Sequence, residues 1–347
     1  MRLLRFDRME ALDVPRLMEL YRESNLENVP ALFPEEADCE EGLRRVEAGF
    51  RDFLETEFFQ TPGSRYYVLE DRERWTAALR MSPVPGTAGG WYAEALETAP
   101  ALRRRGYARR LMELCCYALA EEGPFTLSDR VSLHNEASLA FHNSVGFARL
   151  EGPALSRLSG ESNPRACGFC YRFAGWQAQR IRPEELSERY AVRRLTAAEL
   201  PALLALCRSN PQFYRFCPPA PSEESLRSEL AALPPRMTLN DKYYLGFYEG
   251  ERLAAVLDLI PGFPKPEIAF WGFFMLDAAF QGCGRGSALV AELCAALKAL
   301  GFRAVRLGWI EANPQASRFW RKNGFTETGA AYDTDGYTVT VGQKELT

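Results

Sequence analysis

The same loop of small residues occurs twice in this chain, 178 positions apart. The first copy lies in ALRRRGYARRLM and the second in AFQGCGRGSALV. In each copy a polar residue (Arg103 or Gln281) precedes a glycine (Gly106 or Gly284) by three positions, and a very small residue follows after one more. Such a repeat constrains the fold strongly, because each copy must complete its own structural unit.

Landmarks downstream of the loop keep the same offset. Asn135 and Asn313 differ by 178 positions, and so do two Gly-Phe pairs at 146–147 and 324–325. Three landmarks that share one offset are not easily produced by chance. They predict two copies of one domain, one after the other along the chain.

Upstream of the loop the offset changes. Pro15 and Pro201, each near the start of an amphipathic helix, differ by 186 positions, whereas the tandem tyrosines Tyr66-Tyr67 and Tyr243-Tyr244 differ by 177. The first copy therefore carries nine more residues than the second between that helix and the tyrosines. A length difference between matched landmarks belongs in a loop or a surface helix.

The length fits two domains, because 347 residues exceed one typical core. We place the first domain at 1–175, a linker with a short helix at 176–189, and the second domain at 190–347. In each we expect a strand, helices, a hairpin, a strand entering the loop, a helix, a strand, a short helix and a closing hairpin. Interleaved elements of this kind predict a layered α/β (α+β) domain.

Charge and hydropathy narrow the class of partner. The formal net charge is −4, which argues against a general grip on nucleic acid. No run approaches the roughly 20 apolar residues of a membrane helix, and the N-terminal residues lack the apolar run of a signal peptide. We therefore expect a cytoplasmic protein that binds neither nucleic acid nor a membrane.

Nine cysteines are scattered along the chain. Cys167 and Cys170 form one C-x-x-C pair, but a zinc site needs a second pair or histidines. The two histidines, His134 and His142, are distant in sequence from this pair. No metal site is predicted, and Cys167 is expected to lie on one strand face with Phe169.

The repeated loop lies between a strand end and a helix start. Backbone N–H groups point outward there, the helix dipole adds positive charge, and glycine lets a ligand approach the backbone closely. Such a junction suits a phosphate or pyrophosphate, to which the loop arginines can add charged donors. Neither copy has the lysine of a P-loop, and Ser287 interrupts the glycine fingerprint of dinucleotide-binding folds.

With both motifs in view, each half resembles the GNAT superfamily of acetyl-CoA-dependent N-acetyltransferases. The hallmark [RQ]xxGx[GA] appears as residues 103–108 and 281–286. The second motif, an Asn followed by a small residue, an aromatic and Gly-Phe, appears as NEASLAFHNSVGF and NPQASRFWRKNGF. The resemblance covers nearly the whole chain and implies two tandem domains, each a mixed, mostly antiparallel sheet flanked by helices.

The resemblance implies acetyl-CoA as the acyl donor, no metal, and direct attack of an amine on the thioester. The pyrophosphate would lie on the loop amides, and the pantetheine arm along the preceding strand. A backbone N–H between the fourth and fifth strands would stabilise the oxyanion. The implied cofactor-binding residues are Leu96, Thr98, Arg103, Arg104, Arg105, Gly106, Tyr107, Ala108 and Asn135 in the first copy, and Met275, Leu276, Gln281, Gly282, Cys283, Gly284, Arg285, Gly286, Ser287, Asn313 and Trp320 in the second.

Two departures from the family pattern concern the acid and the base. The family often has a tyrosine seven residues after the motif Asn, as acid for the leaving thiolate, where this chain has His142 and Trp320. Histidine can donate a proton near neutrality and tryptophan cannot, so His142 is the candidate acid; the alternative is a structural helix residue. Glu94 is the candidate base, and Asp258 is a weaker candidate in the second copy.

Three functions remain open at this point. The first is an N-acetyltransferase with at least one active domain, acting on a small-molecule or peptide amine. The second is a regulatory protein that binds acyl-CoA without turnover. The third is an internal pseudo-dimer in which one domain has only a structural role. Because Glu94 and His142 both lie in the first copy, we expect the clearer chemistry there.

Overall fold

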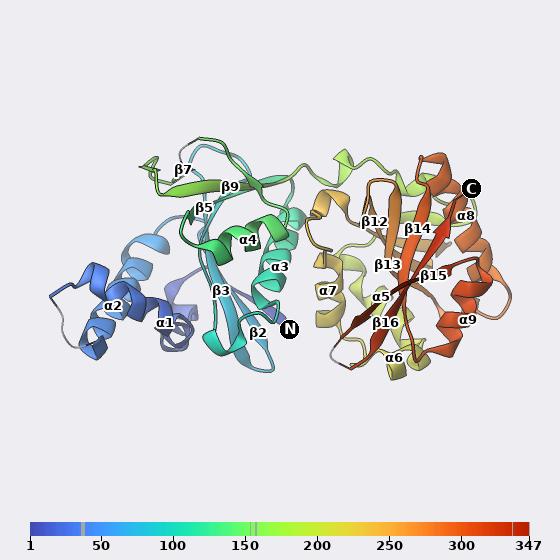
Figure 1. The fold of residues 1–347 in the computed structure, drawn as a ribbon, viewed down its shortest axis with the longest axis horizontal. Coiled ribbons are helices and arrows are strands. Elements are labelled where there is room, and N and C mark those ends of the chain that lie inside the picture. The colour runs from blue at the N-terminus through green and yellow to red at the C-terminus, as the bar shows by residue number, and fades with distance from the viewer. Residues whose placement is uncertain (36–38, 153, 157, 335, 347) are drawn as a thin grey trace. The chain divides into compact units, whose positions relative to one another are not determined.

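The computed structural model describes residues 1–35, 39–152, 154–156, 158–334 and 336–346. By its internal contacts the chain divides into two compact units, Met1–Gly175 and Trp176–Thr347 (Figure 1). Each unit has one large sheet with helices on both faces.

The first unit is built on a seven-stranded sheet with the order β1-β2-β3-β4-β5-β9-β6. Its β4–β5 pair is parallel and the other described pairs are antiparallel. A small separate ribbon, β7–β8, is inserted before β9. The strands are β1 (Arg2–Phe6), β2 (Arg65–Asp71), β3 (Arg74–Pro83), β4 (Gly90–Thr98), β5 (Phe125–Ser132), β6 (Ala148–Arg149), β7 (Ala154–Leu155), β8 (Ser162–Asn163) and β9 (Ala166–Phe173).

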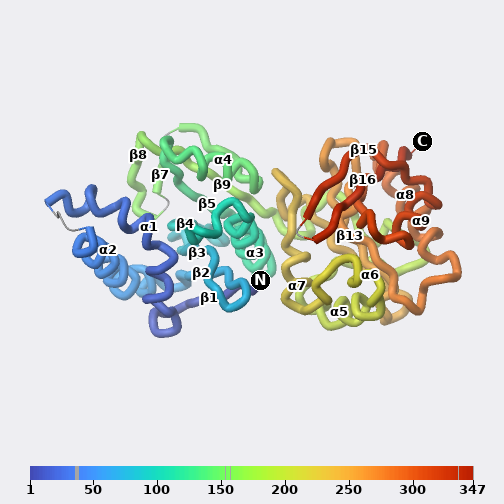
Figure 2. Tube along the Cα trace, turned by 60° about the horizontal axis from the view of Figure 1, so that its bottom comes forward, coloured from blue at the N-terminus to red at the C-terminus, as the bar shows by residue number. Residues whose placement is uncertain are grey.

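Helices cover both faces of this sheet (Figure 2). Helices α1 (Val14–Leu32) and α2 (Cys39–Phe53) lie on one face, and α3 (Tyr107–Glu122) and α4 (Glu136–Ser144) on the other. Helix α1 starts where Asp13 accepts a hydrogen bond from the backbone N–H of Arg16, with a proline in the first turn. Both features favour a helix start, and the helix buries an apolar stripe against β2 and β3.

The second unit repeats this plan, with the order β10-β11-β12-β13-β14-β16-β15 and β13–β14 as its parallel pair. Helices α5 to α7 lie on one face, and α8 and α9 on the other. This result confirms the predicted fold class for both halves. The elements are β10 (Ala191–Arg194), α5 (Leu200–Arg208), α6 (Pro211–Phe216), α7 (Glu223–Ala231), β11 (Tyr243–Glu249), β12 (Arg252–Pro261), β13 (Ile268–Leu276), α8 (Arg285–Ala299), β14 (Ala304–Ile310), α9 (Pro314–Lys322), β15 (Thr326–Asp333) and β16 (Thr338–Glu345).

Strand registers correct the alignment of the two hairpins. Tyr66 pairs with Arg80 in the first unit, and Tyr244 pairs with Asp258 in the second. Both hairpins carry their register irregularity at the same place, so the 178 offset holds throughout them. The sequence-based match of Tyr66 to Tyr243 was wrong by one residue, because two adjacent tyrosines allow either alignment. With offsets of 186 and 178, the first unit has eight extra residues upstream, not nine.

The segment 176–189, expected to be a linker, packs within the second unit. It contains two short 3₁₀ turns, Trp176–Ala178 and Pro183–Glu185. Ile181 and Leu186 are buried in the core of that unit. The amide of Gln179 donates to the backbone carbonyls of Leu239 and Asn240, at 2.9 Å each. These contacts tie the segment to the core of the second unit and to the turn that precedes β11.

Candidate functional site

In both units the central parallel strands part before they end. Strands β4 and β5 pair over three residues of each strand, the last pair being Tyr92 and Ser128. Strands β13 and β14 pair over four, the last being Trp271 and Leu307. Beyond these pairs β4 and β13 continue with one edge no longer bonded to the neighbouring parallel strand. We call each such place the strand parting.

A β-bulge marks each strand parting. In β4 the register against β3 shifts between Glu94 and Glu97, and Ala95 has a φ of 53°. In β13 the extra residue is Gly272, between Trp271 and Phe273. A bulge re-aims side chains and frees backbone groups, and it is often found beside active sites. The first bulge is held from α1, because the Tyr21 hydroxyl donates to the carbonyl of Ala95.

The repeated loops follow these strands and open into helices α3 and α8. The N-cap residues are Gly106, with φ 84°, and Gly284, with φ 81°, and neither helix has a side-chain cap. Two positions earlier the backbone is again left-handed, at Arg104 (φ 65°) and Gly282 (φ 83°). Both helices therefore begin with exposed, uncapped N–H groups, which is the arrangement that binds an anion.

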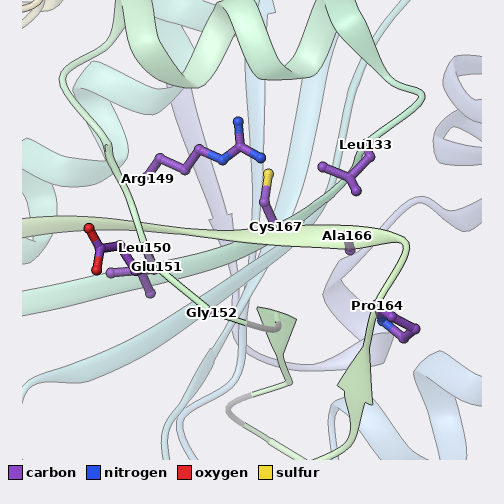
Figure 3. A pocket seen from close by; sticks show the side chains of 8 residues that line it. All are labelled: Leu133, Arg149, Leu150, Glu151, Gly152, Pro164, Ala166 and Cys167. Carbon is purple, nitrogen blue, oxygen red and sulfur yellow. The ribbon is translucent and has the colours of Figure 1, made fainter.

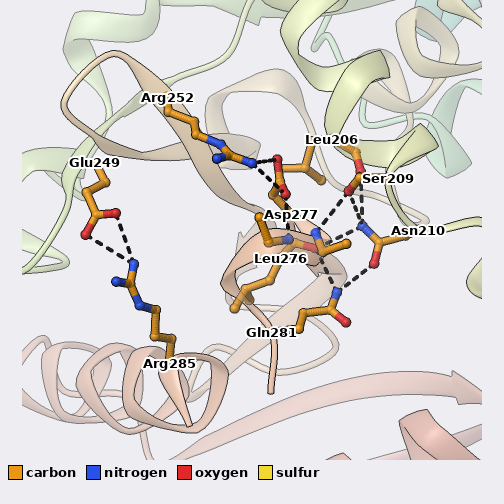
Figure 4. A network of polar contacts seen from close by, with 11 residues as sticks. Leu206, Ser209, Asn210, Glu249, Arg252, Leu276, Asp277, Gln281 and Arg285 are labelled. Atoms are coloured by element: carbon orange, nitrogen blue, oxygen red, sulfur yellow. Dashed lines mark hydrogen bonds and ion pairs between the residues drawn. The ribbon is translucent and has the colours of Figure 1, made fainter. Parts of the chain in front are cut away.

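Side chains of the loops differ in their partners. Arg103 is held by the carboxylates of Glu23 (2.5 Å) and Glu97 (3.2 Å), so it braces the loop. Arg285 is paired with Glu249 at 3.0 Å, as Figure 4 shows. Arg104 and Arg105 are exposed. These two arginines therefore supply the outward-facing charge of the first loop.

Gln281 takes the bracing role of Arg103 in the second unit. Its amide donates to Asn210 (2.6 Å) and to the carbonyl of Leu276 (3.0 Å) (Figure 4). Asn210 donates to the same carbonyl at 2.9 Å. The loop is thereby tied to the segment after α5 by neutral hydrogen bonds instead of ion pairs.

Backbone groups predicted to hold a pantetheine arm are partly used within the protein. The N–H of Thr98 donates to the side chain of Glu97 at 3.1 Å, and Leu276 accepts the two side-chain bonds just described. Met275 is paired with Val256 of the neighbouring strand. Leu96 lies within the β4 bulge, where the strand departs from a regular ladder.

The two motif asparagines act as helix N-caps. Asn135 accepts from the N–H of Ser138 at 2.9 Å, at the start of α4. Asn313 accepts from Gln315 and Ala316 at 3.1 Å each, at the start of α9. Their side-chain oxygens are thus committed to the helix, which explains locally why Asn stands at each position.

His142 is locked in place and does not present a proton to a ligand. Its ring is 1% exposed and stacks on Phe169 with centroids 5.0 Å apart. Nδ1 lies 2.7 Å from the carbonyl of Ser138, and Nε2 lies 2.7 Å from a carboxylate oxygen of Asp129. Because both ring nitrogens have partners, the predicted role as acid for a leaving thiolate does not fit this structure.

Trp320, at the matching position in the second unit, belongs to an aromatic cluster. It is 7% exposed and contacts Phe274, Phe319 and Phe325 with centroid separations of 5.6, 4.9 and 5.2 Å. A Cβ at Gly286 would lie 3.2 Å from the ring of Phe319. The small residue of the loop is therefore needed for α9 to pack on the start of α8.

Glu94, the candidate base of the first unit, lies on β4 at the first strand parting. Its side chain is 32% exposed and its carboxylate is 3.4 Å from the guanidinium of Arg80 on β3. Arg80 is itself held over the ring of Phe53, 4.6 Å from its centroid. Glu97, the other carboxylate of the strand, is committed to Arg103. Glu94, at 32% against 18% for Glu97, is thus the more exposed of the two carboxylates of β4.

Asp258 and Lys242 form a buried ion pair in the second unit, and no sequence motif pointed to the lysine. Lys242 Nζ lies 2.9 Å from Asp258 Oδ2, with side chains 1% and 11% exposed. Burial raises the pKa of the Asp258 carboxyl, and Lys242 lowers it in part. The pair became visible only through the strand register, because Lys242 and Asp258 are 16 positions apart.

Features outside the strand partings do not add to this site. A shallow hollow of about 480 Å³ at the edge of the first sheet is shown in Figure 3, where Arg149 and Cys167 extend toward each other. Cys167 Sγ donates to the carbonyl of Val131 at 3.8 Å. Within the described ranges, no three His, Cys, Asp or Glu residues are grouped as metal ligands, and no helix is long and apolar enough to cross a bilayer. The hollow is lined by Leu133, Arg149, Leu150, Glu151, Gly152, Pro164, Ala166 and Cys167.

The fold and the paired junctions define a protein with two similar helix starts that lack a side-chain cap, each beside a strand parting. The chain belongs to the acetyltransferase (GNAT) family, whose model matches residues 17–147 and 208–325. Each match ends at the Gly-Phe pair of its unit. The family assigns the chain to acyl transfer in general. A search of the curated proteins gives no match.

Solved structures with detectable similarity include an acetyltransferase from Thermus thermophilus, at 21% identity and a TM-score of 0.38 over 44% of this chain and 95% of that one. The ribosomal-protein-S18-alanine N-acetyltransferase from Escherichia coli has 18% identity and a TM-score of 0.34 over 45% and 93%. The PaiA N-acetyltransferase from Thermoplasma acidophilum, in complex with coenzyme A, has 22% identity and a TM-score of 0.34 over 44% and 97%. Family membership rests on the family match alone.

Proposed function

We propose that the protein is an N-acetyltransferase that transfers an acetyl group from acetyl-CoA to the amine of a small molecule or peptide. The observation that carries the proposal is the repeated juxtaposition of two features. In each unit a strand that has parted from its parallel neighbour is followed, after one 3₁₀ turn and the small-residue loop, by a helix start without a side-chain cap and with a left-handed glycine at its N-cap.

Each feature has a separate task in the proposed reaction. The loop N–H groups and the helix dipole bind the pyrophosphate. Unpaired backbone at the strand parting binds the arm and, at the bulge, stabilises the oxyanion that forms on the thioester carbon. The amine nitrogen forms the new N–C bond, the C–S bond breaks, and the amine proton passes to a nearby carboxylate.

In the first unit that carboxylate is Glu94. It lies at the strand parting and is held by Arg80, so it accepts a proton without leaving its place. Neither His142 nor Trp320 supplies a proton to the thiolate in this arrangement. The leaving thiolate therefore takes its proton from solvent, which is adequate for a thiol with a pKa of about 8.5.

Binding without turnover is the second candidate function, and one observation favours it for the second unit. The aromatic cluster of Trp320 packs closely beside the start of α8, where a Cβ at Gly286 would lie 3.2 Å from the ring of Phe319. The two candidates differ in whether acetyl-CoA is consumed by that unit when an amine is present.

The test is release of free CoA thiol from acetyl-CoA with a panel of amines. The panel contains polyamines, amino acid amides, aromatic amines and N-terminal peptides, and the full chain is used throughout. Amine-dependent release supports the proposal, and mass spectrometry of the product identifies the acetylated nitrogen. If no amine raises thiol release above the rate without amine, while acetyl-CoA binds, the protein is a binding protein and the proposal is wrong.

A further inference from the structure

The two strand partings place a carboxylate and a cation differently. In the first unit the carboxylate of Glu94 is on β4 and the cation, Arg80, is on β3. At the equivalent positions, offset by 178, the second unit has Gly272 on β13 and Asp258 on β12. The strand position that carries the cation Arg80 in the first unit thus carries the carboxylate Asp258 in the second.

The glycine leaves room for that carboxylate. A Cβ at Gly272 would lie 2.6 Å from Oδ2 of Asp258, closer than side-chain atoms pack. The carboxylate of Asp258 therefore fills the space in which a side chain on β13 would begin. Gly272 itself is exposed and has no side chain, so the carboxylate of Asp258 lies close beneath the surface of the bulge.

A different residue supplies the cation. Lys242, at the position of Ser64 in the first unit, places Nζ 2.9 Å from Oδ2 of Asp258 and 2.7 Å from the carbonyl of Ala232. In the part of the chain that the structure describes, Oδ1 of Asp258 is buried and has no hydrogen-bond partner. A buried carboxylate oxygen without a partner is costly, and a ligand donor is one way to satisfy it.

We propose that Asp258 accepts the proton of the acceptor amine in the second unit, in the role that Glu94 has in the first. This inference rests on the proposed function. In the step, the amine nitrogen bonds to the thioester carbon, the C–S bond breaks, CoA leaves as thiolate, and the amine proton passes to Oδ1. Lys242 keeps its bond to Oδ2 throughout and holds the carboxylate toward the bulge.

The surroundings of Asp258 favour an amine on an apolar body. Phe273 is the cross-strand partner of Asp258, and its ring contacts Phe213 edge-on, with centroids 5.9 Å apart. Aromatic faces attract cations and apolar groups alike. The charged and titratable groups that act on the Asp258 carboxyl come from several elements. They are Lys242, the residue just before β11, Tyr244 on β11, Arg194 on β10 and Glu229 on α7.

Burial raises the pKa of the Tyr244 hydroxyl well above its usual value, so Tyr244 stays neutral in the working range. Lys242 and Arg194 lower the pKa of the Asp258 carboxyl, and burial and Glu229 raise it. Burial is the largest of these effects, so the carboxyl pKa lies above its ordinary value, in the direction that suits a proton acceptor.

The experiment isolates the second unit within the full chain. The background variant Gly106→Glu disables the first loop, and Asp258→Asn is added to it. We expect kcat with an aromatic primary amine to fall by about 10²-fold or more, the usual scale of acid–base catalysis, with unchanged acetyl-CoA affinity by calorimetry. Glu185→Gln, an exposed carboxylate-to-amide change far from the strand parting in sequence, is the matched control. Unchanged kcat in the Asp258→Asn variant overturns the inference.

A second variant covers the case in which Asp258→Asn does not fold. Lys242→Met keeps the carboxylate but removes the charge that lowers its pKa, so the acidic limb of the kcat/KM profile should move to higher pH. An unmoved limb overturns the inference. If wild type is active but the Gly106→Glu background is not, the inference fails and the proposed function stands. If wild type is inactive with every amine, the proposed function itself fails.

Discussion

The two units solve the same problem at the strand parting with different residues. In the first, Glu94 on the bulged strand is 32% exposed and Arg80 holds it from the next strand. In the second, the bulged strand contributes only Gly272, and the buried Asp258 reaches the same place from the next strand. The comparison teaches that the location of a carboxylate can persist while the strand that carries it changes.

The loops show the opposite behaviour, with the same backbone carrying different residues. Residues 104 and 282 both have left-handed φ values, 65° and 83°, although one is arginine and the other glycine. The left-handed region costs a side-chain-bearing residue roughly 1–2 kcal/mol. Backbone geometry at the loop is therefore constrained more tightly than side-chain identity, in keeping with a ligand held by backbone N–H groups.

The largest expected effect concerns the loops themselves. Gly284→Glu and Gly106→Glu each place a strained, negatively charged residue at an N-cap meant for an anion. We expect titration calorimetry with acetyl-CoA to give two sites in wild type, one in either variant and none in the double variant. A wild-type stoichiometry of one, abolished by Gly284→Glu alone, would show that the first loop has lost its ligand and that the units differ in binding, not only in chemistry.

Glu94→Gln tests the first unit in the Gly284→Glu background. Losing the proton acceptor should lower kcat by about 10²-fold or more, with acetyl-CoA binding unchanged. The control is Glu97→Asp, which keeps a carboxylate toward Arg103. If Glu94→Gln keeps the full rate while Asp258→Asn fails in the other background, turnover belongs to the second unit alone.

His142→Phe should affect stability and spare chemistry. The substitution removes both ring nitrogens and leaves the carboxylate of Asp129, which is 12% exposed, without its partner. Leaving a buried acceptor without its hydrogen-bond donor costs about 1–3 kcal/mol, which urea denaturation should show. Activity per folded molecule should stay within about twofold, since both ring nitrogens are already used. A large loss of kcat in protein that remains folded would restore the acid role.

Arg104→Gly and Gly282→Arg form a reciprocal pair with the smallest expected effects. Relieving the left-handed strain at residue 104 should stabilise the first unit by about 1 kcal/mol, and introducing it at 282 should destabilise the second by a similar amount. Thermal denaturation measures both. Equal and opposite shifts support a shared loop backbone, whereas a destabilised Arg104→Gly variant would mean that the arginine side chain contributes contacts of its own.

Most of the fold followed from the sequence, because it depends on spacing. The 178 offset, the matching Asn and Gly-Phe landmarks, and the glycine loops together predicted two layered domains with matching elements. The hairpin alignment failed at Tyr66, since a tandem pair of tyrosines fits two registers equally well. The segment 176–189 was expected to be a linker, whereas the burial of Ile181 and Leu186 depends on a core formed by distant strands.

The parts of the candidate site that depend on backbone conformation could be predicted from the sequence. The parts that depend on which side chains meet in the folded structure could not. The left-handed turns at Gly106 and Gly284 follow from the motif itself. The pairing of Asp258 with Lys242 requires the register of β11 on β12, which no local pattern contains. The burial of His142 depends on Asp129 and Phe169 from two other strands, so a position in a motif could not reveal that both ring nitrogens are occupied.

The carboxylate lies on β4 in the first unit and on β12 in the second. Converting the first arrangement into the second by single substitutions therefore depends on the order in which they are made. Changing Arg80 to aspartate first would put two acidic groups side by side, which favours protonation of one of them. Changing Glu94 to glycine first would leave no carboxylate at all. Installing a lysine at the position of Ser64 before either change supplies the countercharge that both later steps need. A stepwise route between the two arrangements thus begins at Ser64, whose hydroxyl lies 3.2 Å from the hydroxyl of Ser82 in the first unit.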